Sequence, residues 1–342
     1  ESGGQVGDSG FLVDGSERTA IIDTVKENNL IVHLTSKLPS NPKASFRAEV
    51  DVEKRTLTAD NHTATHLMHE ALREILGKHV EQKGSLVTPE YLRFDFAHFQ
   101  KVSPEELAQV EKTVNHRIRQ NIPLEEMREI PIQKAHELGA MALFGEKYGD
   151  VVRAIRFGSS TELCGGTHVK ATGQLGFFKI ISESSISAGI RRIEAVTAVK
   201  AEEFINHQQN LLREISGMLK SPANLQKSVE NVIAENAMMG QKVDAIIRSM
   251  MNIEKRNLID SAVKVGNICV IVAQVKPFLM DYMKDLSFQL RNELDEVVAV
   301  LGCDGNDKPQ LSVIASDRVV SDHHFNAVDV IRAVSHHIQG GG

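Results

Sequence analysis

The sequence contains no tryptophan and only three cysteines and three tyrosines among its 342 residues. So few cysteines exclude the dense disulfide framework that supports small secreted domains. No apolar run approaches the roughly 20 residues that a membrane-spanning helix needs. The sequence also shows no secretory signal peptide. These absences predict a cytoplasmic protein that does not associate with a membrane and whose thiols stay reduced.

Composition and charge limit the classes of function that the chain can serve. With 42% hydrophobic and 25% charged residues, the sequence is typical of a globular protein of two or three domains. A net charge of −6 is unsuited to a protein that coats nucleic acid indiscriminately. Residues 147–200, however, hold eight Lys or Arg and four Asp or Glu, whereas residues 276–342 hold six and ten. If RNA binds, we expect the more basic segment to bind it.

Two short motifs carry the residue types that bind transition metals. In His62-Thr-Ala-Thr-His66, two histidines four residues apart would share one face of a helix. In Cys164-Gly-Gly-Thr-His168, two glycines permit a tight turn that lets the thiolate and the imidazole converge. Either pair alone is a weak signal, but together they supply three imidazoles and one thiolate, a tetrahedral set for Zn²⁺. We therefore predict a zinc site formed by His62, His66, Cys164 and His168.

The surroundings of these motifs narrow the kind of metal site. A metalloprotease would carry a general-base glutamate directly after the first histidine, where this chain has Thr63. The spacing also argues against a classical zinc finger, since the ligand pairs of a zinc finger lie within a few tens of residues of each other. Bound zinc can polarise a carbonyl, which suits ester hydrolysis, whereas four protein ligands are typical of structural sites. The sequence leaves both roles open, and it favours His69 as a polar neighbour and not a ligand.

Four motifs together resemble one family. In chain order they are Glu1-Ser-Gly-Gly-Gln-Val-Gly-Asp8, the His62 and Cys164 motifs, and Gly189-Ile-Arg-Arg-Ile-Glu-Ala195. Their order, spacing and identity resemble the editing domain of alanyl-tRNA synthetases over residues 1–195, and the remainder is similar to the C-terminal region of the same enzymes. Because the chain starts inside a motif and without Met, the resemblance implies a C-terminal fragment. Such a fragment would carry the editing domain and an oligomerisation and tRNA-binding region.

The resemblance implies an activity. A synthetase pocket for alanine rejects the added hydroxyl of serine only weakly, by a factor on the order of 100, so a second site is needed. That site hydrolyses the aminoacyl ester of seryl- or glycyl-tRNA for alanine. The resemblance places Gln5 in this pocket, and we assign Gln5 and Cys164 to catalysis, although Gln5 could instead only follow a Gly-Gly turn. Two alternatives stay open: a free-standing deacylase, and a zinc-stabilised module that binds RNA and dimerises without turnover.

Other residues are candidates for binding the substrate, tRNA for alanine. Thr63, Ser85 and Thr167 carry hydroxyl groups that could sense the hydroxyl of a serine ester. Arg191 and Arg192 are candidates for holding acceptor-stem phosphates, and surface ion pairs are the alternative role for these two arginines.

Turn signals and hydrophobic periodicity predict an α+β fold. Residues 1–55 alternate short apolar runs with turns and are predicted to form a small β unit, part of a barrel. Residues 56–198 mix strands and helices without strict β-α-β alternation, which predicts an α+β editing core that holds the zinc site. We expect its first helix to begin near His62, where Asp60 or Asn61 could cap it.

The C-terminal part of the chain is predicted to be helical and then mixed. Residues 199–262 carry apolar side chains at 4,3 spacing from Leu225 to Asn257, broken from an earlier helix by Pro222. This pattern predicts a helical hairpin or coiled coil, through which we expect a homodimer. From about Asn267 the sequence shows the order strand, helix, strand, strand, helix, and residues 263–342 are predicted to form a small α/β domain.

Overall fold

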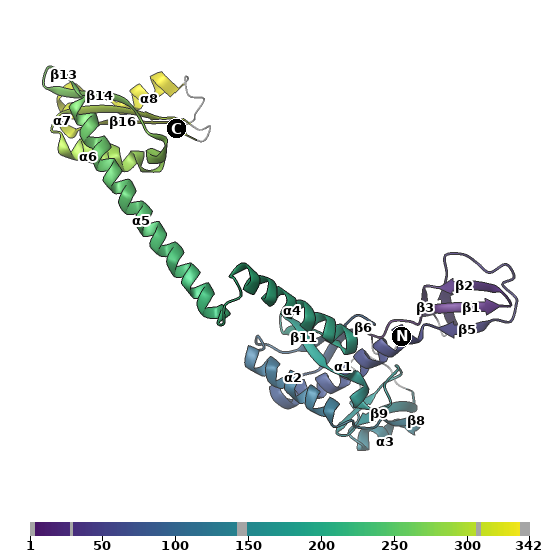
Figure 1. Ribbon diagram of the computed structural model, residues 1–342. Coiled ribbons are helices and arrows are strands. Elements are labelled where there is room, and N and C mark those ends of the chain that lie inside the picture. The colour runs from purple at the N-terminus through teal and green to yellow at the C-terminus, as the bar shows by residue number, and fades with distance from the viewer. Residues whose placement is uncertain (1–3, 28–29, 142–148, 306–308, 336–342) are drawn as a thin grey trace. The chain divides into compact units, whose positions relative to one another are not determined.

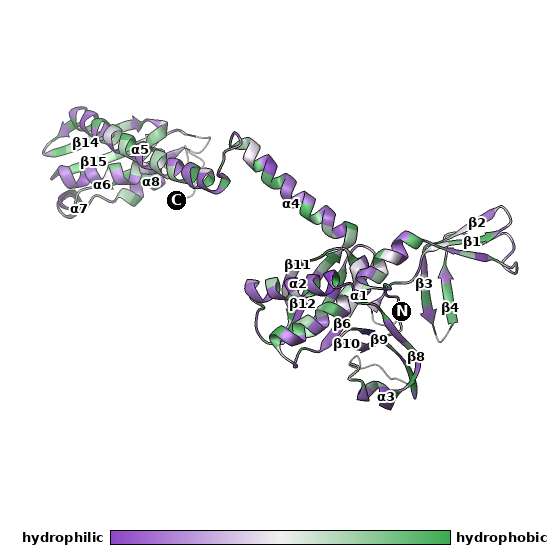
Figure 2. Cartoon of the chain, turned by 60° about the horizontal axis from the view of Figure 1, so that its bottom comes forward, coloured by the Kyte–Doolittle hydropathy of each residue, from purple (hydrophilic) through white to green (hydrophobic). Residues whose placement is uncertain are grey.

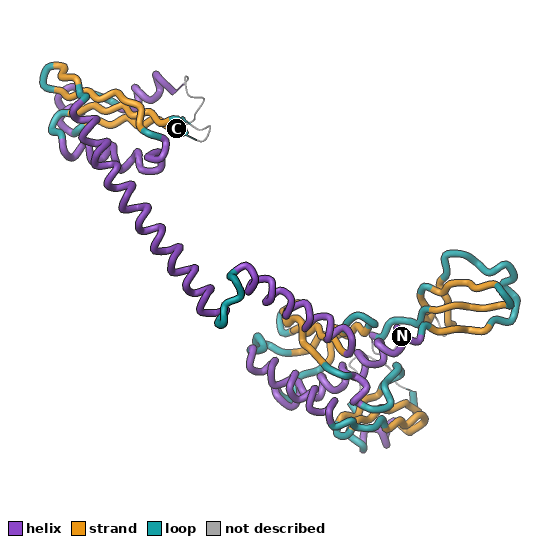
Figure 3. The backbone as a smooth tube through the Cα atoms, in the orientation of Figure 1, coloured by secondary structure: helices purple, strands orange, loops and turns teal. Residues whose placement is uncertain are grey.

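The computed structural model describes residues 4–27, 30–141, 149–305 and 309–335 (Figure 1). The chain divides into two compact units, Glu1–Ile215 and Ser216–Gly342. Both units contain helices and strands, which confirms the expected α+β class (Figure 3). The finer division into four domains stays a prediction. Among the described residues, no helix is both long and apolar enough to cross a membrane.

A small antiparallel β unit comes first, as expected. Strands β1 (Gly10–Asp14), β2 (Glu17–Ile21) and β5 (Arg47–Val50) form a sheet in the order β2-β1-β5. Strand β3 (Asp23–Glu27) pairs with β4 (Leu30–Leu34) in a separate hairpin. The described strands of this part thus form two small sheets, and β5 leads directly into the first helix.

Helix α1 (Val52–Leu76) begins a full ten positions earlier than the sequence predicted. The Asp51 side chain caps it by accepting a hydrogen bond from the Lys54 amide at 3.1 Å. The prediction that Asp60 or Asn61 caps this helix is therefore wrong, since both residues lie inside the helix and are buried.

The main sheet of the first unit has the order β11-β12-β7-β6 and is antiparallel throughout. Its strands are β6 (Gln82–Val87), β7 (Leu92–Ala97), β11 (Phe178–Ser187) and β12 (Ile190–Thr197). Ser103 caps helix α2 (Pro104–Arg119) and forms a reciprocal capping box with Glu106. Apolar residues of α1, α2 and the sheet form one core, which includes Leu67, Val114, Phe94, Phe178 and Ile193.

A second, three-stranded sheet positions the Cys164 motif. It has the order β10-β9-β8 and comprises β8 (Glu125–Pro131), β9 (Val151–Phe157) and β10 (Ser160–Leu163), with α3 (Ile132–Glu137) following β8. All four residues of β10 are buried, and Cys164 follows this strand directly. A 3-10 helix, Thr172–Leu175, comes after the motif. The fixed end of β10 therefore determines where the thiol lies.

Two long helices follow, α4 (Ala198–Met218) and α5 (Leu225–Asp260), and the break between them contains Pro222 as predicted. Apolar residues recur along α5 (Figure 2), and many of them are exposed. Val243 is 49% exposed and Ile246 is 58% exposed, for example. The helices themselves are confirmed, whereas their pairing as a hairpin or coiled coil stays a prediction.

The C-terminal strands form a sheet of order β13-β14-β15-β16, with β14 and β15 parallel and the other pairs antiparallel. Helix α6 connects the two parallel strands, so the predicted order of strand, helix, strand, strand, helix is confirmed. The elements are β13 (Val263–Val265), β14 (Ile268–Val275), the 3-10 helix Pro277–Tyr282, α6 (Met283–Glu293), β15 (Val297–Cys303), β16 (Gln310–Ala315), α7 (Asp317–His323) and α8 (Ala327–Ser335). A separate apolar core, which includes Leu286 and Leu301, supports this sheet.

Candidate metal centre

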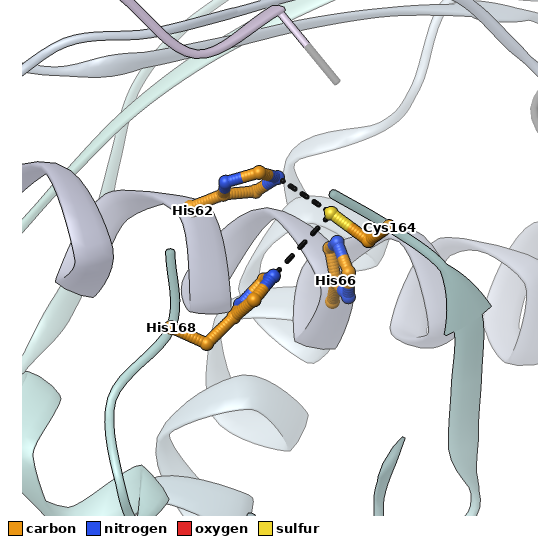
Figure 4. Close-up of side chains that lie close together, drawn as sticks. All are labelled: His62, His66, Cys164 and His168. Atoms are coloured by element: carbon orange, nitrogen blue, oxygen red, sulfur yellow. Dashed lines mark hydrogen bonds between the residues drawn. The ribbon is translucent and has the colours of Figure 1, made fainter. Parts of the chain in front are cut away.

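The His62 and Cys164 motifs, which carry the candidate metal ligands, meet in the folded chain (Figure 4). One potential ligand atom from each of His62, His66, Cys164 and His168 lies within 4.8 Å of the others. The Sγ atom of Cys164 is 3.4 Å from His62 Nε2 and also 3.4 Å from His168 Nε2. His62 and His66 share one face of α1, and the Cys164 motif closes over that face. The structure thus brings all four predicted ligands together.

A tight loop between Cys164 and His168 makes this convergence possible. A Cβ atom on Gly166 would lie 2.1 Å from His62 Cε1 and 2.7 Å from Gln5 Oε1, so only glycine fits at this position. Arg153 on β9 holds the same loop from its other side, because its Nη1 donates to the carbonyl oxygens of Cys164 at 2.9 Å and of Gly166 at 2.7 Å. Sequence reasoning missed Arg153, which lies outside both motifs.

Oxygen atoms orient two of the three imidazoles. His62 Nδ1 is 2.7 Å from Gln5 Oε1, which can only accept a hydrogen bond, so Nδ1 donates and the lone pair lies on Nε2. His168 Nδ1 is 3.1 Å from Thr63 Oγ1. In both rings, Nε2 is the nitrogen next to the thiol. Hydrogen bonds of this kind on the outer nitrogen fix the ring orientation that a metal ligand needs.

Glu162 completes the surroundings of the third imidazole. Its Oε2 lies 3.5 Å from His66 Nε2, and its Oε1 lies 3.1 Å from His69 Nδ1. His69 is thus a buried polar neighbour that contacts Glu162, as the sequence suggested, and it is not among the four clustered ligands. The sequence analysis did not predict a role for Glu162. The available signal was its position in a strand, two residues before Cys164.

Burial sets the protonation of the site. Loss of solvent lowers the pKa of His62 and of His168 well below the ordinary histidine value, and neighbouring positive groups lower it further. Burial also lowers the pKa of His66, although nearby Glu162 opposes this effect. Neutral imidazole is the form that binds a metal, so protons compete little with a metal ion here. The donor types, the burial and the ring orientations therefore fit a bound metal ion.

Gln5 links the N-terminal motif to the cluster. Its Oε1 also accepts hydrogen bonds from the Thr167 amide at 2.8 Å and from Thr167 Oγ1 at 3.1 Å. The neighbouring Val6 amide donates to the Val87 carbonyl oxygen at 3.0 Å, which ties this segment to β6. Gln5 is therefore not incidental to a turn: it is 3% exposed and contacts both metal-binding motifs. Residues 1–3 of its motif lie outside the described residues.

The other predicted substrate residues differ in their distance from the cluster. Thr63 contacts His168 of the cluster directly, whereas Thr167 hydrogen-bonds to Gln5, which in turn contacts His62. Ser85 lies on β6 against Gly4, and its Oγ is buried without a hydrogen-bond partner among the described residues. Arg191 on β12 pairs with Glu183, and Arg192 donates to both carboxylate oxygens of Asp95, at 2.6 and 2.8 Å. Both arginines therefore form ion pairs within the protein, which was the alternative to binding phosphates. Their contact with tRNA stays a prediction.

An open groove of about 890 Å³ adjoins the cluster. Its walls come from the first half of α1, from β8 and β9, and from the Cys164 motif. Basic side chains outnumber acidic ones along it. The basic residues are Arg55, Arg128, Arg153 and Lys170, and the acidic residues are Asp60 and Glu126. Burial raises the pKa of the Asp60 carboxyl to about 6. Sequence reasoning did not find this groove, because its residues come from separate elements.

Comparison with known proteins places this arrangement in a family. The family described as "Threonyl and Alanyl tRNA synthetase second additional domain" matches residues 152–194. The alanine–tRNA ligase of Cytophaga hutchinsonii is 48% identical over 344 residues, that of Bacteroides fragilis 49% over 343, and that of Flavobacterium psychrophilum 44% over 351. Each match covers 100% of this chain and 39% or 40% of the relative, so the chain spans about two fifths of the length of these curated relatives. Over its whole length, the chain is therefore similar to a part of the alanine–tRNA ligases.

Proposed function

We propose that the first unit holds one zinc ion and hydrolyses the aminoacyl ester of mischarged seryl- or glycyl-tRNA for alanine, as part of an alanine–tRNA ligase. The observation that carries this proposal is the convergence of three imidazoles and one thiol beside an open, basic groove. The match of residues 152–194 to a domain of threonyl- and alanyl-tRNA synthetases supports it.

The ligand set supports zinc in particular. Three imidazoles and one thiolate suit the tetrahedral preference of Zn²⁺, whereas calcium and magnesium prefer oxygen ligands. When bound, zinc supplies a positive charge that polarises a neighbouring carbonyl or lowers the pKa of nearby water.

The groove has the chemistry that the 3′ end of a charged tRNA requires. Its basic residues suit phosphate groups, and Thr167, which lines the groove, has a hydroxyl group that could recognise a serine side chain. Thr63 is fully buried and does not line the groove, so its role would be to hold His168. A pocket built to hydrogen-bond a hydroxyl rejects alanine strongly, because alanine leaves buried polar groups unpaired. Gln5 would position the substrate together with the Cys164 motif.

The zinc-loaded chain is expected to deacylate seryl-tRNA for alanine while leaving alanyl-tRNA largely intact, by a ratio of at least about 100 in kcat/KM. The measurement is the initial rate of release of labelled amino acid from each ester at tRNA concentrations below and above KM, which gives kcat/KM for both esters. Release of serine would also separate the hydrolase from a binding module without turnover. Equal rates on both esters would contradict recognition of the hydroxyl group.

Changing Gln5 to alanine is expected to lower or alter editing while the metal stays bound. The variant leaves the His62 Nδ1–H and the Thr167 amide without their buried acceptor, at a cost of about 1–3 kcal/mol for each unpaired group. All four metal ligands remain. Metal analysis and the rates at which the variant deacylates seryl- and alanyl-tRNA test this expectation. Unchanged rates on both esters would contradict the assignment of Gln5 to the pocket.

A homodimer through α4 and α5 is a second proposal, favoured by the exposed apolar residues of α5. In a dimer, changing Val243 and Ile246 to glutamate would bury two charges and cost several kcal/mol. We expect the native chain to sediment as a dimer at micromolar concentration and the double variant as a monomer of equal helix content. A monomeric native chain would instead favour a hairpin closed within one chain.

A further inference from the structure

One carboxylate of the groove takes no part in the proposed metal centre. Asp60 lies on α1, two residues before His62, and lines the groove. It is 3% exposed, and its Oδ1 is buried without a hydrogen-bond partner among the described residues. A buried carboxylate without partners is costly, so its presence calls for an explanation.

Three of the four basic residues that line the groove pair with other acidic residues. Arg55 pairs with Asp8. Arg128 and Arg153 both pair with Glu126, at 3.2 and 2.7 Å. Among the described residues, no ion pair involves Asp60, so the groove offers one acceptor to a cation that arrives from outside.

We infer that Asp60 binds the α-ammonium group of the aminoacyl ester, an inference that rests on the proposed function of this groove. The α-ammonium group is the positive charge that an aminoacylated tRNA end carries beside its reacting ester. Asp60 lines the same groove as His168, which belongs to the proposed metal centre. The phosphates of the same substrate would contact the arginines and Lys170.

Other ligands fit Asp60 less well. A carboxylate repels phosphate, so Asp60 is not a contact for the RNA backbone. A divalent cation such as calcium takes six to eight oxygen ligands, whereas Asp60 belongs to no cluster of three or more potential ligands among the described residues. Asp60 also does not cap α1, since Asp51 has that role.

Binding of a stable substrate analogue tests the inference. The probe is adenosine that carries serine through an amide at its 3′ position, and the comparison ligand is its N-acetyl derivative, which has no positive charge. Titration calorimetry on the zinc-loaded chain at pH 7 keeps the free amine largely protonated, because an α-amino group has a pKa of roughly 7.7–8.0. We expect the native chain to bind the free amine about 10- to 100-fold more tightly than the acetylated ligand.

The variants isolate the charge of Asp60. Asp60→Asn keeps the size of the side chain and is expected to lose the preference for the free amine, whereas Asp60→Glu should keep part of it. Glu53→Gln, on the same helix but outside the groove, should keep it fully. Metal content and thermal unfolding show whether each variant retains its fold.

The outcomes separate this inference from the proposed function. The ammonium site is overturned if folded Asp60→Asn still binds the free amine more tightly than the acetylated ligand. It is also overturned if this variant weakens the binding of both ligands by the same factor. If the native chain prefers the free amine through Asp60 but hydrolyses no ester, the hydrolase proposal fails and the ammonium site stands.

Discussion

Replacing Cys164 and His168 together with alanine is expected to reduce bound zinc from about one ion per chain to nearly none. The double variant removes the thiolate and one imidazole, so that only the His62 and His66 pair on α1 remains. Two imidazoles alone hold zinc weakly compared with a complete tetrahedral set. Editing of seryl-tRNA should fall with the metal, by a factor on the order of 100 or more.

Elemental analysis of the purified protein measures the metal directly. Cys269→Ala serves as the matched control, since Cys269 lies on β14 in the other unit and should not affect the zinc content. Stoichiometric zinc in the double variant would disprove the assignment of the four ligands.

Gly166→Ala is expected to damage the site almost as much, although glycine offers no ligand. The new methyl group would lie 2.1 Å from His62 Cε1 and 2.4 Å from His62 Nδ1. The His62 ring is buried and hydrogen-bonded to Gln5. To accommodate the methyl group, either the ring must rotate away from Gln5 or the loop must move away from α1. Either change separates the two motifs, and we expect metal affinity to fall by at least about 10- to 100-fold.

Competition with a chelator of known affinity measures this loss. Gly240→Ala is the control, because nothing lies within 4 Å of the added atom and the change stabilises the middle of α5 slightly. Native zinc affinity in Gly166→Ala would show that the loop adapts and that the close packing has no role.

The clustering of the four candidate ligands could be predicted from the sequence because their chemistry and their spacing within each motif are both local. Two histidines at i and i+4 meet on any helix, and two glycines permit the Cys164 turn in any context. The partners of these ligands could not be predicted in this way. Glu162 and Arg153 reach the site only because β9 and β10 pair and lie against α1, and nothing in a single sequence reports that pairing.

The start of α1 shows a different limit. Asp60 and Asn61 have good capping propensity, and a local rule places a helix start there. The residues from Thr58 to His66 are nevertheless all buried, although most of them are polar. Hydrophobic periodicity identifies a buried helix by its stripe of apolar residues. A helix that buries hydrogen-bonded polar groups has no such stripe and is therefore not detected. Asn61, for example, donates to the Thr88 carbonyl oxygen and accepts from Thr197.

The distance in sequence between the two metal-binding motifs has a consequence for chain entropy. His62 and Cys164 are 102 residues apart. An ion bound to both acts as a reversible cross-link, and closing a loop of this length in the unfolded chain is worth roughly 4–5 kcal/mol in the chain-entropy model of cross-links. As long as the ion stays bound to both motifs, it would restrain the chain of Glu1–Ile215 as a disulfide does, although the three cysteines are all free. Because Ser216–Gly342 has a core of its own, its thermal unfolding should not respond to a chelator.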